Sequence, residues 1–303
     1  MRICIFGAGS LGCALGGILA RKNVVTLIGR KRNMSAIREN GLKLIGDTRS
    51  RVRLDARETC EGISPPELLV ISTKAFDTEE AVKYCSTWID KDTMVLTLQN
   101  GLGNLELLRG WKGKKAFGGT TTMGAALLSP GVVRVSGLGG TVIGSDLDPS
   151  GAKRIASSLR SCGLKVDLSR DIIGGIWSKA VVNACINPTA AVLRVPNGKL
   201  TESPVVSHFM KDVSKECELV ASALGVNLPG GPSYARVRTV CRDTSKNKSS
   251  MLQDVLNGRK TEIDHINGAF CMYGDGLGIS TPLNDALVAM IRSMPPGSSP
   301  EKG

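Results

Sequence analysis

The stretch that determines the fold of this 303-residue chain is RICIFGAGSLGCALGGILARK, residues 2–22. Its first part is a short apolar run that leads directly into glycines, which is typical of a buried strand. Residues 10–22 have the apolar spacing of a helix. A second apolar run, VVTLIGR at 24–30, completes a strand–helix–strand unit within about 30 residues. Such units build parallel sheets.

The glycines of this stretch have the spacing G-x-G-x-x-G, at Gly7, Gly9 and Gly12. We expect Gly7 to allow a tight turn, Gly9 to let a pyrophosphate approach the backbone, and Gly12 to let the helix pack closely on the sheet. The helix N-terminus would add unpaired N–H groups. A strand precedes the motif and a helix and a strand follow it, so the sequence predicts dinucleotide binding, and the alternative is a turn that binds nothing. The residues between the glycines are Ala8, Ser10 and Leu11.

The end of the second strand indicates which dinucleotide is bound. An NAD-binding chain usually carries Asp or Glu there for the ribose hydroxyls. This chain reads LIGRKRN, with Arg30, Lys31 and Arg32 and no acidic residue. Guanidinium and ammonium groups bind a 2′-phosphate, whereas a carboxylate would repel it. The sequence therefore favours NADP, with Arg30 best placed because it directly follows Gly29.

Two further strand ends carry polar residues. Lys74 follows the run LLVIST, and Asn100 follows VLTLQ and precedes Gly101. Ligands of open α/β sheets bind beyond the carboxyl ends of the strands, so both residues are candidates for the cofactor site. The alternatives are a solvated loop lysine and a turn asparagine, since Asn-Gly favours turns.

The character of the chain changes near residue 169. Before it, strands alternate with helices, and the runs at 131–137 and 140–145 look like a late β pair. After it, only helical patterns follow, and we expect helices at 172–187, 204–224, 250–257, 261–273 and 282–294. The predicted organisation is an α/β domain with a doubly wound parallel sheet at residues 1–168, an all-α domain at 169–294, and a disordered tail at 295–303.

The net charge of +12 raises nucleic acid as a partner. The excess is local, because residues 21–57 contain eleven Arg or Lys and three Asp or Glu. A cluster beside a nucleotide-binding motif attracts small phosphates equally well, so we expect a small-molecule substrate and no nucleic acid. No stretch reaches the ~18 apolar residues of a membrane helix, and the glycines at the N-terminus argue against a signal peptide.

Nine cysteines occur singly, without a C-x-x-C pair, and the chain has two histidines. This pattern indicates neither a zinc site nor a disulfide scaffold, so we expect no metal. Unpaired thiols in this number favour a cytoplasmic location. The sequence does not fix the oligomeric state, for which a homodimer is our working expectation.

The stretch WSKAVVNACINP, residues 177–188, places Lys179, Asn183 and Asn187 four residues apart. Four residues advance a helix by about 400°, so these side chains form one polar stripe on an apolar helix. Asparagine is a poor helix residue, and a solvent-facing stripe would usually carry Glu, Arg or Gln. We therefore interpret the stripe as the wall of a polar cleft. Pro188 disfavours helical geometry at the residue before it, which predicts that the helix ends at Asn187.

The stretch NKSSMLQDVLNGRKTEIDHINGAF, residues 247–270, holds a second set of polar residues. Ser250 and Gln253 have the spacing of a capping box, so Ser250 is a candidate N-cap. Thr261 could cap the next helix, which would place Glu262 in the first turn. A helix N-terminus that faces a cleft would also suit an anionic substrate.

Taken together, these motifs resemble the ketopantoate reductases, which reduce 2-dehydropantoate to pantoate on the pathway to coenzyme A. The resemblance covers residues 1–294. It rests on FGAGSLG, STKA, LQNGLGN, PNG, W-x-K-x-x-x-N-x-x-x-N-P and SSMLQD followed by TEIDHING. It implies a Rossmann domain, an all-helical domain and an active site between them. Ala180, where we expected leucine, is a mild departure that concerns local packing.

The resemblance also implies roles for individual residues. Lys179 matches the catalytic lysine and Glu262 the active-site acid, while Ser250 matches the serine that holds the substrate carboxylate. The substrate-binding positions are Asn100, Asn183, Asn187, Asn197, Asn247 and Ser250. The cofactor-binding positions are the loop Gly7, Ala8, Gly9, Ser10, Leu11 and Gly12, together with Arg30, Lys74, Asn100 and Glu262.

The expected reaction is hydride transfer from NADPH to a 2-keto carbon, with Lys179 as the general acid. Its pKa would have to fall through desolvation and nearby positive charge, and an ionised Glu262 would oppose that fall. We assign Glu262 to orienting the substrate or Lys179. The first alternative is another NADP-dependent 2-keto or 3-hydroxy acid dehydrogenase of the same architecture. The second is a non-catalytic NADP-sensing or nucleic-acid-binding protein.

Overall fold

The computed structural model describes residues 1–294, and the tail predicted at 295–303 lies outside the described residues. The chain forms two compact units. The first comprises Met1–Gln99 and Asn104–Ile172. The second comprises Asn100–Gly103 and the chain from Ile173 onward. A short segment from the first half of the sequence therefore belongs to the second unit.

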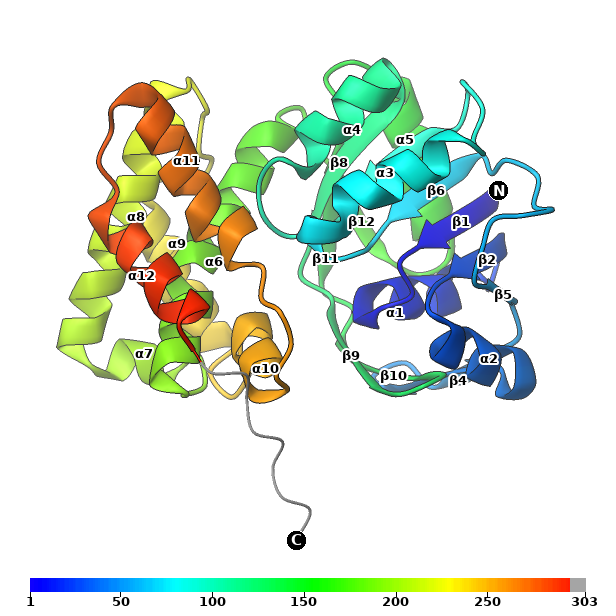
Figure 1. Cartoon of the computed structure of the whole chain (residues 1–303), viewed down its shortest axis with the longest axis horizontal. Helices are drawn as coiled ribbons and strands as arrows, with labels where there is room; N and C mark the ends of the chain where they lie inside the picture. The colour runs from blue at the N-terminus through cyan, green and yellow to red at the C-terminus, as the bar shows by residue number, and fades with distance from the viewer. Residues whose placement is uncertain (295–303) are drawn as a thin grey trace, which may run out of the picture. The chain divides into compact units, whose positions relative to one another are not determined.

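The first unit is built on an eight-stranded sheet (Figure 1). In spatial order its strands are β12 (Lys165–Leu168), β11 (Gly140–Gly144), β8 (Ala116–Thr121), β7 (Met94–Thr97), β6 (Leu68–Ile71), β1 (Arg2–Phe6), β2 (Val24–Ile28) and β5 (Asp55–Arg57). β1 pairs in parallel with β2 on one side and with β6 on the other. The strand order reverses between β1 and β6, which is the position where open α/β sheets bind ligands. The predicted doubly wound sheet is confirmed and is predominantly parallel, with β11 antiparallel to β8.

A second sheet of the first unit has four strands in the order β4 (Ser50–Val52), β3 (Leu42–Gly46), β10 (Val132–Gly137) and β9 (Gly124–Ser129). The expected pairing of the runs at 131–137 and 140–145 is wrong. β10 pairs with β9 and β3, whereas β11 pairs with β8 and β12. Between them Gly139 adopts a φ of +56°, and the chain passes here from one sheet to the other. Neighbours in sequence are therefore members of different sheets.

Helices connect the strands of the first unit. They are α1 (Ser10–Leu19), α2 (Lys31–Asn40), the 3-10 turn η1 (Ala75–Asp77), α3 (Thr78–Ser86), α4 (Asn104–Lys112), the 3-10 turn η2 (Gly113–Lys115) and α5 (Pro149–Ser161). The core contains apolar residues of α1, α5 and the strands of both sheets. α2 and α4 were not predicted, because charged or polar residues dominate their outer faces and leave only a short apolar stripe, Met34 and Ile37 in α2 and Leu105 and Leu108 in α4.

All regular elements in the described part of the second unit are helices. They are α6 (Ile172–Leu193), α7 (Lys199–Glu202), α8 (Pro204–Ala223), α9 (Ser233–Asp243), α10 (Ser250–Leu256), the 3-10 turn η3 (Ile263–His265), α11 (Asn267–Leu277) and α12 (Pro282–Arg292). Their core is separate from that of the first unit. Trp177 of α6 packs edge-on against Phe270 of α11, with 5.5 Å between ring centroids. The predicted all-α second part is confirmed.

The expectation that α6 ends at Asn187 is wrong, since the helix continues through Pro188 to Leu193. Proline has no N–H for the carbonyl oxygen four residues earlier, that of Ala184. The side-chain amide of Asn267 donates to this oxygen instead, at 3.0 Å. A substitute donor thus offsets the bond that proline removes, and the helix can go on.

The helix expected at 261–273 is also wrong in its start. The segment divides into η3 and α11, because Ile266 between them has φ −107° and ψ −90°, outside the helical region. Thr261 consequently caps no helix, and Glu262 precedes η3 instead of lying in a first turn of α11. α7 and α9 were not predicted.

All nine cysteines are buried and unpaired. Burial raises the pKa of the Cys13 thiol to about 11. Within residues 1–294, none of the helices combines the length and apolar content that crossing a bilayer requires.

Candidate active site

The glycine-rich loop joins β1 to α1 at the reversal point of the sheet. Gly7 has a φ of +107°, which side chains rarely adopt. A β-carbon on Gly12 would lie 2.1 Å from the carbonyl oxygen of Gly7, so only glycine lets α1 pack here. At Gly9 a β-carbon would meet no atom within 4 Å. The loop is therefore tight at its ends and open at its middle, which is the shape needed for close approach of a pyrophosphate.

The remaining residues of the loop have structural partners. The backbone N–H of Ala8 donates to Ile28, and its carbonyl accepts from Asn33 at 2.9 Å. The hydroxyl of Ser10 accepts from the N–H of Leu127 at 3.0 Å. Leu11 is partly buried against the core. These contacts hold the conformation of the loop, and the open space beside Gly9 is the part suited to a ligand.

Arg30, Lys31 and Arg32 lie where β2 passes into α2, with Arg30 as the N-cap residue of that helix. All three are exposed, and within residues 1–294 their side chains form no hydrogen bond or ion pair. The positive end of the helix dipole adds to their charge. This end of β2 can therefore receive an anionic group.

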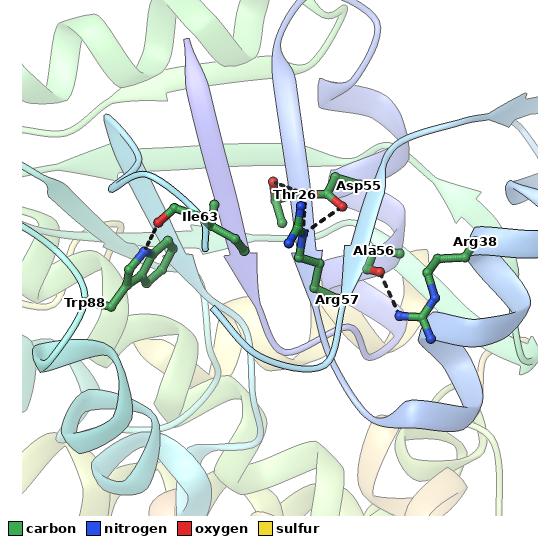
Figure 2. Close-up of polar contacts among 7 residues, drawn as sticks. All are labelled: Thr26, Arg38, Asp55, Ala56, Arg57, Ile63 and Trp88. Carbon is green, nitrogen blue, oxygen red and sulfur yellow. Dashed lines mark hydrogen bonds and ion pairs between the residues drawn. The ribbon is translucent and has the colours of Figure 1, made fainter. Parts of the chain in front are cut away.

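Other arginines of the same basic region are already bound, as Figure 2 shows. Arg38 donates to the carbonyl oxygen of Ala56 on β5 at 3.1 Å and pairs with Glu58. Arg57 forms an ion pair with Asp55 at 2.8 Å. Arg38 and Arg57 therefore have structural roles, whereas the group at 30–32 remains unpaired beside the end of β2.

Lys74 and Asn100 follow the strands after which they were predicted. Lys74 is half-buried and precedes η1, three residues after the end of β6. Asn100 is half-buried and begins the segment that belongs to the second unit. In this segment the N–H of Leu102 donates to the carbonyl oxygen of His265 at 2.9 Å, which ties it to η3. Both residues take part in further interactions of their side chains or backbone.

The stripe of α6 brings Lys179, Asn183 and Asn187 onto one face of an apolar helix. Lys179 and Asn183 are half-buried, and Asn187 is 6% exposed. The side chains of the two asparagines have no hydrogen-bond partner within the described residues. Neither amide is among the fully buried polar atoms without a partner, so both amides remain accessible to solvent or to a ligand. Two such amides on one face of an apolar helix are suited to binding a polar ligand.

Lys179 interacts electrostatically with Glu262, which is 7% exposed. Desolvation lowers the pKa of Lys179 to about 8, although the nearby Glu262 carboxylate acts to raise it. Desolvation is the larger effect, because removing an ammonium group from water disfavours its charged form. Lys179 is therefore both a charge and a usable acid near neutral pH.

Asn197 and Asn247 lie beside each other in the second unit. The N–H of Asn197 donates to the carbonyl oxygen of Asn247 at 2.9 Å, and its side-chain amide donates to Thr244 at 2.8 Å. The Oδ1 atom of Asn197 is buried and has no partner within the described residues. Asn247 is exposed. No motif of the sequence indicated Thr244, whose hydroxyl accepts from the Asn197 side chain and orients it.

The assignment of Ser250 as an N-cap is corrected by the structure. The cap of α10 is Ser249, whose hydroxyl accepts from the N–H of Leu252 at 3.1 Å. Ser249 is buried and also donates to the carbonyl oxygen of Asn187 at 3.3 Å. Ser250 is the first residue of the helix and is exposed. The capping-box spacing fits Ser250 and Gln253 but not Ser249, which is followed three residues later by Leu252, so the motif indicated the wrong serine. The Ser250 hydroxyl is left available for a ligand.

Known proteins match the chain along nearly its whole length. The sequence profile of ketopantoate reductase PanE/ApbA matches residues 3–147, and that of its C-terminal part matches residues 171–294. The 2-dehydropantoate 2-reductase of Pyrococcus horikoshii is 37% identical over 97% of each chain. A crystal structure of a PanE/ApbA family ketopantoate reductase from Ralstonia eutropha has a TM-score of 0.91 at 32% identity, covering 97% of this chain and 98% of that one.

A second solved structure differs in its ligands. The ternary structure of D-mandelate dehydrogenase with NADH and anilino(oxo)acetate has a TM-score of 0.92 at 29% identity, over 97% of this chain and 98% of that one. The two family profiles and the relative at 37% identity agree with the motifs and the two-part fold. The chain belongs to the ketopantoate reductase family of oxidoreductases.

Proposed function

We propose that this chain reduces 2-dehydropantoate (ketopantoate) to (R)-pantoate with NADPH, as a step of pantothenate and coenzyme A biosynthesis. The observation that carries the proposal is the lowered pKa of Lys179. This lysine lies on an apolar helix beside Glu262, and desolvation lowers its pKa to about 8. The name given to the Pyrococcus horikoshii relative supports it. A cytoplasmic location and a homodimeric state are parts of the same proposal.

In this mechanism the first unit binds the cofactor and the second binds the keto acid. When bound, NADPH supplies a hydride to the keto carbon. The carbonyl oxygen thereby gains an electron pair, and Lys179 donates a proton to it, which forms the alcohol and leaves a neutral amine. The amine then regains a proton from solvent. Before transfer, the ammonium charge stabilises the developing negative charge on oxygen.

The neighbours of Lys179 orient the reacting groups. Glu262 opposes the loss of the lysine proton, so we assign it to holding Lys179 or the substrate hydroxyl in place and not to lowering the pKa. Asn183 and Asn187 cannot titrate, so they orient a hydroxylated acid without competing for the proton. Ser250, Asn197, Asn247 and Asn100 complete the proposed substrate site.

NADPH is the proposed cofactor because the end of β2 carries three unpaired cations and no carboxylate. The open position at Gly9 admits the pyrophosphate, and Lys74 and Asn100 follow neighbouring strands. The D-mandelate dehydrogenase structure contains NADH, so architecture alone does not select the phosphate.

The same structure raises the alternative function. D-mandelate dehydrogenase acts on a 2-hydroxy acid by its name, and its fold matches this chain as closely as that of the reductase. Another 2-keto acid is therefore the second candidate substrate of the same machinery.

A matched pair of keto acids tests the substrate. We expect ketopantoate to be reduced at least about 100-fold more efficiently, in kcat/KM, than 3,3-dimethyl-2-oxobutyrate, which lacks only its hydroxyl. The reason is that the analogue leaves the side-chain amides assigned to the substrate hydroxyl, those of Asn183 and Asn187, without a partner. Oxidation of NADPH is followed for both acids and for benzoylformate, the keto acid of mandelate. Preference for benzoylformate would replace the proposal with the second candidate.

Arg30→Ala should raise the KM for NADPH about tenfold or more and leave the KM for NADH nearly unchanged, because only NADPH carries the 2′-phosphate and a charged hydrogen bond contributes roughly 1.5–3 kcal/mol. Arg38→Ala is the matched control, since it removes the same charge from the same helix but its guanidinium is held by Ala56 and Glu58. Equal changes for both cofactors in Arg30→Ala would show that Arg30 is not the selector.

Ser250→Ala should raise the KM for the keto acid about tenfold or more and keep the melting temperature, because its hydroxyl is assigned to the substrate carboxylate. Ser249→Ala should instead lower the stability by about 1 kcal/mol, the usual cost of losing an N-cap, with little change in KM. Thermal unfolding and steady-state kinetics are measured on both variants. A normal KM in Ser250→Ala would remove this serine from the site.

A further inference from the structure

A chain of buried amides joins four helices of the second unit. Asn267, at the start of α11, donates through Nδ2 to the carbonyl oxygen of Ala184 on α6 at 3.0 Å and to Oδ1 of Asn284 on α12 at 2.9 Å. Asn284 donates through its own Nδ2 to Glu216 of α8 at 2.8 Å. Asn267 and Asn284 are 0% exposed, and Glu216 is 9% exposed. The series therefore runs through protein interior from α8 to α6.

Its outer end is fixed by charge. The two carboxylate oxygens of Glu216 accept from the backbone N–H groups of Leu283 at 2.9 Å and Asn284 at 3.0 Å, in the first turn of α12. A carboxylate at a helix N-terminus is stabilised by the unpaired N–H groups and the dipole there. This anchor fixes the orientation of the Asn284 side chain, with Nδ2 toward Glu216 and Oδ1 toward Asn267.

Its inner end replaces a missing backbone bond. Pro188 cannot donate to the carbonyl of Ala184, and the amide of Asn267 donates to this oxygen in its place. Both hydrogens of that amide are in use, while its Oδ1 is buried without a partner within the described residues. A group with two donors is needed here, which serine and aspartate do not provide.

The replaced bond lies within the proposed catalytic stripe. Ala184 directly follows Asn183 and lies five residues after Lys179. Asn267 lies five residues after Glu262, whose carbonyl accepts from the N–H groups of His265 and Ile266 at 3.1 Å. The bond from Asn267 to Ala184 therefore joins the segment that carries Lys179 to the segment that carries Glu262.

We propose that Asn267, oriented by Asn284 and Glu216, is a positioning residue that sets Lys179 and Glu262 relative to each other by replacing the hydrogen bond lost at Pro188. The inference rests on the proposed function in assigning the chemistry to Lys179. The hydrogen bond itself does not depend on which substrate is turned over.

The test combines Asn267→Ala with Pro188→Ala, which restores an N–H four residues after Ala184. We expect Asn267→Ala alone to lower kcat about 10- to 100-fold per folded molecule, the range for a displaced catalytic group, with the KM for NADPH unchanged. In the Pro188→Ala background the same change should cost no more than about threefold, because Ala184 then has a backbone donor. Thr189→Val is the control, since it removes a buried hydrogen bond to Cys185 on the same helix without affecting Ala184.

Thermal unfolding of the wild type, Asn267→Ala, Pro188→Ala and the double variant supplies a readout without substrate. Asn267→Ala should lower the melting temperature in the wild-type background and much less in the Pro188→Ala background. An Asn267→Ala protein that folds only when Pro188→Ala is also present would equally support the bond. A wild-type kcat in Asn267→Ala, or a loss of the same size in both backgrounds, would overturn the proposal. Failure of the wild-type chain to reduce ketopantoate would refute the proposed function and leave the unfolding comparison to decide the bond.

Discussion

The chemistry proposed for the second unit depends on two opposing effects on the pKa of Lys179, which desolvation lowers and the charge of Glu262 raises. Desolvation alone would push the lysine toward the neutral form, in which it has no proton to give. Glu262 alone would hold the proton too firmly. The apolar faces of α6 supply the first effect and the segment before η3 supplies the second, with the net result of a pKa near 8. Because the attraction depends on distance, the relative placement of these two segments affects the acidity of Lys179 directly.

This placement explains features that look like faults in a helix. A proline within α6 and asparagines along its face would each be expected to weaken or end it. The carbonyl that proline leaves unbonded becomes the attachment point for Asn267, and the amides that do not serve the helix are left for a ligand. The glycines of the first unit show the same relation. Gly7 and Gly12 allow the tight turn, and Gly9 leaves space next to the backbone. In both units, residues that disfavour regular secondary structure lie at the proposed ligand-binding positions.

Local patterns predicted the parallel sheet, the helical second part and the stripe on α6, because each depends on residues close in sequence. Some of the errors came from contacts between residues that are distant in sequence, and one was local. The carbonyl that Pro188 leaves without its usual donor accepts from Asn267, 79 positions after the proline. β10 pairs with the distant strand β3 as well as with β9, whereas β11 pairs with β8. The choice of Ser249 over Ser250 as cap depends on a backbone angle that two adjacent serines do not reveal. Of the site residues, the geometry shows Lys179 with Glu262 and the unbonded amides, while ligand contacts remain predictions.

The dependence of ketopantoate reduction on pH tests the central claim, that the Lys179 ammonium is the proton donor. A donor must be protonated, so a pKa lowered to about 8 predicts that kcat is constant at lower pH and falls as pH rises through that value. Lys179→Ala should lose about 10²- to 10⁴-fold in kcat, as for other general acids, and should lose this fall as well. A wild-type profile without a fall between pH values of roughly 7 and 10, or the same fall in Lys179→Ala, would contradict the account.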